Sequence, residues 1–173
     1  MRFFFPLVLL FTAIGLGIYA YLGGLRTPTT ALETSAAPVL LAGQAFHGKV
    51  QDAAFGEAFR AAKRWQETQA PAAPLANLYY NDPEAAHDSI KAFVGLAVAD
   101  TAARLPTGWR YRVVPAGQRV VVARLAGASY LLAPGKLYAA AEAALTTLKL
   151  HKQPPYLEQF GPGEASELRI GVK

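Results

Sequence analysis

Two stretches of the sequence place polar and aromatic side chains at matching positions, 81 residues apart. They are PLANLYYNDP, residues 74–83, and PYLEQFGP, residues 155–162. Successive side chains of a strand point to opposite faces of a sheet. If both stretches are strands, one face carries five candidate ligand-binding residues: Asn77, Tyr79, Tyr156, Glu158 and Phe160.

Glu158 is the ionisable acid of this set. Between Tyr156 and Phe160 it would be partly desolvated, which raises the pKa of a carboxyl, and a cationic ligand would reverse that cost by pairing with it. Aromatic faces would add cation–π attraction of roughly 0.5–2 kcal/mol each. The same carboxyl could serve as a general base for water, and the plain alternative is a solvated edge-strand residue. Trp109, which opens an expected strand, is a sixth candidate for the ligand site.

Other kinds of chemistry find little support in the sequence. There is no cysteine, and His47, His87 and His151 are scattered without the spacing of zinc ligands. We therefore expect no metal and no cofactor, and we assign no catalytic residue. The net charge is +5, but the basic residues are dispersed rather than gathered in a stripe, so we expect no nucleic-acid partner.

A repeated pattern indicates the elements that position these residues. Strand, helix, strand and strand follow one another twice, with helices expected at 52–68 and 134–150 from their apolar spacing. Each half buries too little apolar surface alone. We therefore predict an α+β fold in which a duplicated βαββ unit forms one antiparallel sheet with two helices on one face. Leu78, Tyr80 and Leu157 are expected to face the helices, which leaves the candidate site on the open face.

The N-terminal segment FFFPLVLLFTAIGLGIYAYL, residues 3–22, contains no charged side chain. As a helix it would rise about 30 Å, the hydrocarbon thickness of a bilayer. We expect a single transmembrane anchor within residues 1–26, with a cleavable signal peptide as the alternative. Residues 27–42 are typical of a linker and residues 43–173 of a domain. Basic residues at both ends of the apolar run leave its orientation undecided.

Three stretches within residues 43–173 resemble the GyrI-like small-molecule-binding family, also described as the effector-binding domain of bacterial transcription activators. They are FHGKV…FGEAFRAAKRW, YRVVPAGQRVVVARLAG and PYLEQFGPGEASELRIGVK. The resemblance implies two βαββ copies and a cleft for aromatic or cationic small molecules, in which a buried glutamate corresponds to Glu158. It also implies that some relatives are hydrolases, and it favours a cytoplasmic location for the domain.

Together these features predict a membrane-tethered, monomeric domain that holds an aromatic, cationic or amphiphilic small molecule around Glu158. Two alternatives stay open. The sheet face without helices could dock a protein partner whose identity the sequence does not give. Alternatively, Glu158 could act as the general base of a hydrolase.

Overall fold

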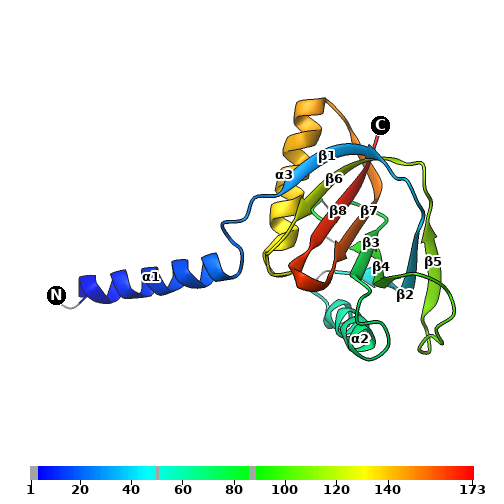
Figure 1. Cartoon of the computed structure of the whole chain (residues 1–173), viewed down its shortest axis with the longest axis horizontal. Helices are drawn as coiled ribbons and strands as arrows, with labels where there is room; N and C mark the ends of the chain where they lie inside the picture. The colour runs from blue at the N-terminus through cyan, green and yellow to red at the C-terminus, as the bar shows by residue number, and fades with distance from the viewer. Residues whose placement is uncertain (1–3, 50, 86–88) are drawn as a thin grey trace.

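The computed structural model of the chain describes residues 4–49, 51–85 and 89–173 (Figure 1). Its eight strands form one antiparallel sheet in the order β1-β6-β8-β7-β3-β4-β2-β5. The strands are β1 (Thr29–Thr34), β2 (Val39–Gly48), β3 (Leu75–Tyr79), β4 (Ile90–Val98), β5 (Arg110–Val114), β6 (Arg119–Leu125), β7 (Lys152–Phe160) and β8 (Ser166–Val172). The helices are α1 (Phe4–Tyr21), α2 (Ala53–Gln69), α3 (Ala133–Leu148) and the short 3-10 helix η1 (Pro162–Glu164).

The order of the elements confirms the predicted duplication. The unit β2–α2–β3–β4 is followed by the unit β6–α3–β7–β8. β3 and β7, the third elements of the two units, pair at the middle of the sheet with Asn77 opposite Glu158. On either side of this pair, Leu75 lies opposite Phe160 and Tyr79 opposite Tyr156. An approximate twofold axis therefore passes between Asn77 and Glu158.

Both α2 and α3 pack on the same face of the sheet, as predicted. Their buried side chains form one core with aromatic residues of β3 and β7. From the helices this core includes Ala58, Ala62, Trp65, Leu137, Tyr138, Ala141 and Leu145. Interiors pack close to crystal density, so the small alanines on the helices leave room for large rings that rise from the sheet.

The prediction of which strand residues face the helices is wrong. Leu78 and Leu157 belong to a second core on the opposite face of the sheet. Tyr80 is 37% exposed, with the Arg112 guanidinium carbon 5.5 Å from its ring centroid. The side chains that alternate with Leu78 and Leu157, including Glu158, lie under the helices instead.

The second core is enclosed because the strand that precedes each unit joins the other half of the sheet. β1 pairs with β6, and β5 pairs with β2. The connections that follow β1 and β5 are hydrogen-bonded to each other: Ser35 N donates to Gln118 O (2.8 Å), and Gly117 N donates to Ser35 O (2.8 Å). The sheet curls toward this side (Figure 1). Apolar side chains are therefore buried on both faces, and an aliphatic residue in a strand does not reveal which face bears the helices.

Residues 27–42, expected to form a linker, contain β1 and the beginning of β2. β1 has the sequence TTALET, and nearly all of its side chains are exposed. Such an edge strand has the same small, polar composition as a linker. Its pairing is supported by an ion pair between Glu33 Oε1 and Arg124 Nη1 of β6 (2.6 Å). The sheet therefore begins at Thr29 rather than within the predicted domain.

α1 extends away from the sheet at the N-terminal end of the chain (Figure 1). Among the described residues, no helix has both the length and the apolar character needed to cross a membrane, so the predicted transmembrane span is not supported. Arg2 and Phe3, at the start of that span, lie outside the described residues, as does His87. The apolar side chains at 7–11 of α1 are between 44% and 64% exposed.

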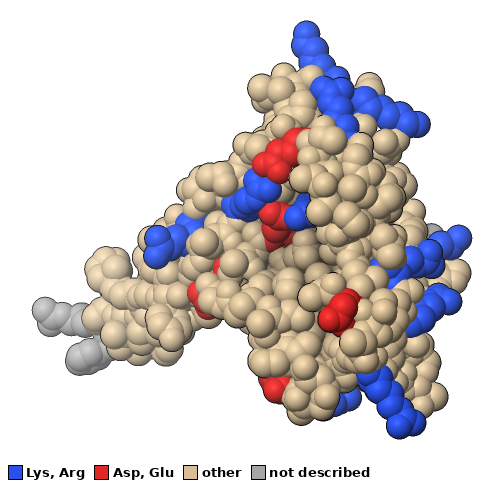
Figure 2. All heavy atoms as spheres, turned by 45° about the vertical axis from the view of Figure 1, so that its right-hand side comes forward, with Lys and Arg blue, Asp and Glu red and all other residues tan. Residues whose placement is uncertain are grey.

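Charged side chains are scattered over the face of the molecule that Figure 2 shows. Basic groups project at several separate places, and acidic groups lie between them (Figure 2). Among the described residues on this face, the basic side chains form no continuous stripe of the kind that binds a nucleic-acid backbone.

Candidate functional site

Glu158 lies on β7 beneath the helices and is 5% exposed. Its Oε2 accepts hydrogen bonds from two side chains of β3, Asn77 Nδ2 at 3.1 Å and the Tyr79 hydroxyl at 3.2 Å. The β3–β7 register, which sets Asn77 directly across from Glu158, positions both donors. Among the described residues, no lysine, arginine or histidine forms an ion pair with this carboxyl. Within the described part of the chain, the site is thus a buried acid held by neutral donors and by no basic side chain.

Two polar atoms at this site are buried without a hydrogen-bond partner among the described residues: Asn77 Oδ1 and the Tyr138 hydroxyl. Tyr138 comes from α3, and its hydroxyl lies near enough to Glu158 to lower the pKa of the carboxyl, but without the geometry of an ordinary hydrogen bond. An unsatisfied buried polar group costs about 1–3 kcal/mol. The two atoms therefore mark a place where polar groups of a ligand would be stabilised.

Burial raises the pKa of the Glu158 carboxyl, and the hydrogen bond from Asn77 is the largest opposing effect. Burial also raises the pKa of Tyr79, and the charge of Glu158 adds to the increase. The pKa of Tyr138 is raised by the same two causes. These directions are those of an acid in a low-polarity environment without a counter-ion. A cation bound at the site would lower the pKa of Glu158 again.

Tyr156 and Phe160 flank Glu158 on β7 and are 3% and 7% exposed. Each lies two residues from Glu158 and therefore on the same face. With Asn77 and Tyr79, they complete the group of five residues that the two matching stretches predict. The structure brings this group together, although under the helices rather than on an open face.

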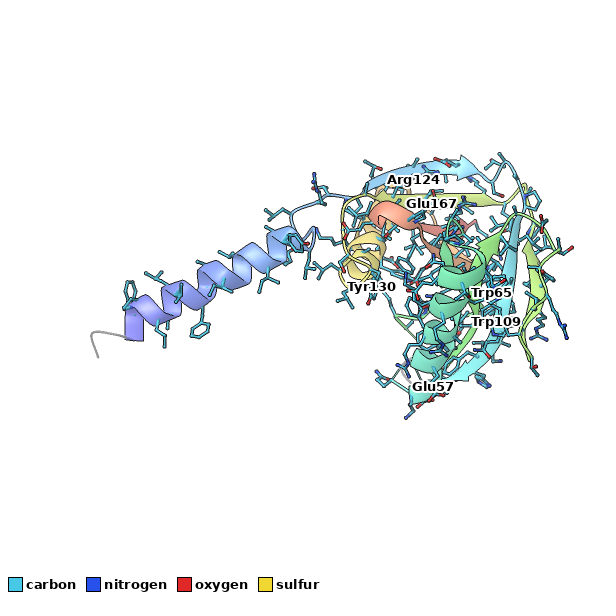
Figure 3. All side chains as sticks on the ribbon, turned by 60° about the horizontal axis from the view of Figure 1, so that its bottom comes forward. Glu57, Trp65, Trp109, Arg124, Tyr130 and Glu167 are labelled. Atoms are coloured by element: carbon cyan, nitrogen blue, oxygen red, sulfur yellow. The ribbon has the colours of Figure 1, made fainter. Side chains whose placement is uncertain are left out.

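Trp109 is not brought to this group. It packs against Trp65 of α2, with the ring centroids 5.4 Å apart (Figure 3). Trp65 is 8% exposed and belongs to the core. Trp109 directly precedes β5, which β2, β4 and β3 separate from β7. Trp109, at the edge of the sheet, therefore covers one side of α2 and does not reach Glu158.

A cavity of about 400 Å³ adjoins the buried group and is lined by α2, the segment before α3 and the β7–β8 turn. Leu75 and Phe160 form part of its lining, and they are the strand pair next to Asn77–Glu158 on the same face. Two residues along a strand span about 7 Å. Phe160 thus borders both the cavity and the buried carboxyl. The volume is in the range of small-molecule sites.

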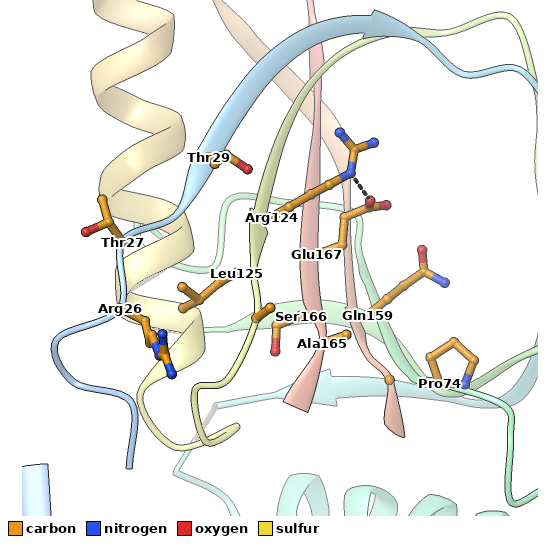
Figure 4. Close-up of a pocket in the computed structure, with 12 residues that line it drawn as sticks. Arg26, Thr27, Thr29, Pro74, Arg124, Leu125, Gln159, Ala165, Ser166 and Glu167 are labelled. Atoms are coloured by element: carbon orange, nitrogen blue, oxygen red, sulfur yellow. Dashed lines mark hydrogen bonds and ion pairs between the residues drawn. The ribbon is translucent and has the colours of Figure 1, made fainter. Parts of the chain in front are cut away.

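A larger hollow of about 700 Å³ lies at the edge formed by β1, β6 and β8 (Figure 4). Its lining includes Arg124 and Glu167, whose Nε and Oε2 atoms are 2.7 Å apart. Gln159 also lines it, and this neighbour of Glu158 on β7 points to the opposite face. Arg124 in this hollow is already paired with Glu33 and Glu167, whereas Glu158 pairs with no basic side chain among the described residues.

Sequence reasoning does not assign three aromatic residues, Phe59, Tyr130 and Tyr138, to the site. Helical spacing places Phe59 and Tyr138 in apolar stripes, and this is correct for their rings. The hydroxyl of Tyr138 in an otherwise apolar stripe is the one signal that indicates a polar neighbour beneath the helix. Tyr130 precedes α3 in a segment without periodicity, and its ring centroid lies 6.2 Å from that of Phe59. No pattern in the sequence places it beside the cavity.

Neither a known protein family nor a curated protein matches the chain in sequence. Solved structures do share its fold. An integron cassette protein from the mobile metagenome of Vibrio cholerae has a TM-score of 0.58 and 11% identity, over 85% of this chain and 96% of that protein. A hydrolase from Listeria innocua has a TM-score of 0.51 and 11% identity, over 86% of this chain and 92% of that protein.

EcmrR, solved in a complex with DNA, has a TM-score of 0.57 and 13% identity. The match covers 84% of this chain and 57% of the EcmrR chain, so this chain spans little more than half of EcmrR. At such identities the likeness shows the fold alone. The shared fold is consistent with the effector-binding domain that the sequence motifs resemble.

Proposed function

We propose that the domain binds an aromatic, cationic small molecule on the helix-bearing face of the sheet, with Glu158 as the anion that pairs with it. The observation that carries the proposal is the buried carboxyl, which accepts hydrogen bonds from Asn77 and Tyr79 but pairs with no basic side chain among the described residues. A buried charge is costly unless it is paired. A cation is therefore the occupant that the site favours. The resemblance to the GyrI-like family supports the same ligand class.

The ligand enters through the cavity beside Phe59 and Tyr130. Phe160 lies between this cavity and Glu158, so a change in its side-chain rotamer opens the way to the carboxyl. The aromatic body of the ligand then occupies the space lined by rings, and its charge lies against Glu158. Asn77 Oδ1 and the Tyr138 hydroxyl, both unpaired among the described residues, become its polar partners.

Protein docking on the sheet face without helices loses its main support. That alternative requires a broad, open apolar face. Among the described residues, the apolar side chains of this face form a buried core that includes Leu41, Phe93 and Leu157.

A titration of the full chain with acridine orange, a flat fluorescent cation, tests the proposal. The protein is kept in mild detergent, and the dye signal is compared for the native chain, Glu158→Gln and Glu57→Gln. Glu57 is an exposed carboxylate on α2 (Figure 3) and serves as the matched control. Loss of a charged hydrogen-bond partner costs about 1.5–3 kcal/mol, so Glu158→Gln should bind roughly 10- to 100-fold more weakly. Equal binding by all three proteins would refute the assignment.

The pH dependence of binding gives a second test. Because the free carboxyl has a raised pKa, a cation must displace its proton when it binds below that pKa. Binding should therefore strengthen as the pH rises, and calorimetry in buffers of different ionisation enthalpy should detect proton release. Neither effect should be seen with Glu158→Gln.

We also propose that α1 attaches the domain to a membrane. Five consecutive exposed apolar residues, 7–11, cover more than one helical turn, so the helix presents apolar side chains on all sides. An N-terminal apolar segment ahead of a GyrI-like domain is also a feature in which the chain resembles testis-expressed protein 264, and that resemblance favours the cytoplasmic side. Vesicle flotation of the native chain and of Ile14→Lys provides the test. The native chain should float with the vesicles, and the variant should float less.

A further inference from the structure

The end of α1 is fixed to the segment that precedes α3. Ser129 N donates a hydrogen bond to Leu22 O (3.0 Å). Gly23 has φ +79°, and a Cβ atom on it would lie 2.1 Å from Gly127 O, so only glycine permits this close approach. Lys136 Nζ donates to Arg26 O (2.5 Å) just beyond the junction. The apolar helix and the domain are therefore joined by specific contacts.

The same segment forms one side of the cavity. Ala128, Ser129 and Tyr130 belong to the cavity lining. Tyr130 is 57% exposed, and Leu131, the next residue, is 70% exposed. Figure 3 shows Tyr130 on the side of the domain from which α1 extends. Two large apolar side chains thus project between the cavity and the root of an apolar helix.

Basic side chains accompany this apolar projection. Arg60 and Lys63 of α2 line the cavity, and Glu164 is the one acidic residue among the described residues that line it. Arg26 is exposed at the junction itself. Exposed tyrosine and leucine beside lysine and arginine make up the composition that binds the headgroup region of anionic membranes.

We propose that the tip formed by Ser129, Tyr130 and Leu131 docks into the interface of an anionic membrane beside α1, so that the cavity opens toward the lipid headgroups. Its ligand is then a membrane-partitioned amphiphile with an aromatic, cationic head. This inference rests on the proposed function of the cavity and on the attachment of α1 to a membrane. It adds the orientation of the domain and the phase from which the ligand comes.

The absence of cysteine from the chain permits a direct test with single introduced cysteines. Leu131→Cys is labelled with the environment-sensitive dye NBD in the full chain and reconstituted into phosphatidylcholine vesicles with and without phosphatidylserine. Val113→Cys, 56% exposed on β5 at the far edge of the sheet, is the matched control (Figure 1). Tyr130→Cys is a second position on the tip. Circular dichroism confirms that each labelled protein is folded.

The label at 131 or 130 should emit at shorter wavelength, and doxyl lipids should quench it, only when phosphatidylserine is present. The label at 113 should show neither effect. Equal behaviour at 131 and 113 would overturn the docking. Quenching at 131 that is independent of phosphatidylserine would overturn the role of anionic lipid.

Two dyes separate this inference from the proposed function. In vesicles, Leu131→Asp should weaken binding of the membrane-partitioning nonyl acridine orange and leave acridine orange, which arrives from water, unaffected. Equal effects on both dyes would overturn the membrane route while leaving the proposed function intact. If neither dye responds to Glu158→Gln but the label at 131 still reports lipid, the proposed function fails and the docking of the tip stands.

Discussion

Replacing Glu158 with glutamine should make the protein more stable at neutral pH and remove a pH dependence that the native chain has. The carboxyl is 5% exposed and, among the described residues, receives hydrogen bonds without an ion pair. Its pKa is raised in the folded state, chiefly by burial. The folded chain therefore binds more protons than the unfolded chain at pH values between the unfolded and folded pKa. Stability must then fall as the pH rises through that window.

The size of this pH dependence is set by the single proton that the Glu158 carboxyl binds. Each pH unit within the window changes the free energy of unfolding by at most about 1.4 kcal/mol. The advantage of Glu158→Gln should therefore grow at up to this slope from about pH 4.5, the ordinary pKa of a glutamate, and level off above the folded pKa. Below the window, where the acid is protonated in both states, the variant and the native chain should be equally stable to within about 1 kcal/mol.

Urea unfolding of the full chain in mild detergent, followed by the fluorescence of Trp65 and Trp109, provides the measurement. The two rings lie 5.4 Å apart between α2 and the start of β5, so their emission reports the packing of this half of the domain. Glu57→Gln should track the native chain at every pH. Parallel curves for Glu158→Gln and the native chain from about pH 4 to pH 9 would refute the reasoning, because a pKa without a shift gives no slope.

Four further substitutions test the geometry of the site and of the junction, all in the full chain. Tyr138→Phe should raise the urea midpoint or leave it unchanged, since its hydroxyl is unpaired among the described residues, whereas Tyr79→Phe should cost about 1 kcal/mol by removing a hydrogen bond. Equal losses in the two variants would show that both phenols bind the carboxylate. Gly95→Ala should lower the free energy of unfolding by about 1–3 kcal/mol, because its Cβ would lie 2.0 Å from a carbonyl oxygen of β2; an unchanged free energy of unfolding would contradict this close approach. Gly23→Ala should leave the midpoint nearly unchanged but speed trypsin cleavage after Arg26, as the junction with α1 opens; unchanged cleavage would argue that the junction tolerates the change.

The arrangement of the sheet could be predicted because the signals are local and occur twice. The spacing of apolar residues predicts helices at 52–68 and 134–150, and α2 and α3 begin within one residue of these positions. The match between Asn77 and Glu158 in the two stretches becomes a cross-strand pair in the sheet. A duplicated unit that joins with its copy around a twofold axis puts equivalent positions opposite each other at the centre.

The face of the site could not be predicted, because the decision depends on distant parts of the chain. Alternation correctly sorts Leu78 and Leu157 from Asn77 and Glu158, but it does not say which set the helices cover. That depends on the exchange of β1 and β5 between the halves, which encloses the second core. The sequence of β1 does not indicate a strand, since an exposed edge strand has the composition of a linker.

The twofold axis also explains why a duplicated fold has a one-sided site. Two identical carboxyls at the axis would repel each other, whereas Asn77 opposite Glu158 supplies a donor to an acceptor. The pair Leu75–Phe160 on one side of the axis borders the cavity, while its counterpart Tyr79–Tyr156 is buried on the other.

Near that second side, Lys152 at the start of β7 pairs with Asp82 Oδ2, 2.7 Å away in the turn that follows β3, and with Glu142 of α3. These ion pairs join the turn, β7 and α3. Under the proposed function, the ligand therefore reaches the buried carboxyl from the other side of the axis, where Leu75 and Phe160 border the cavity.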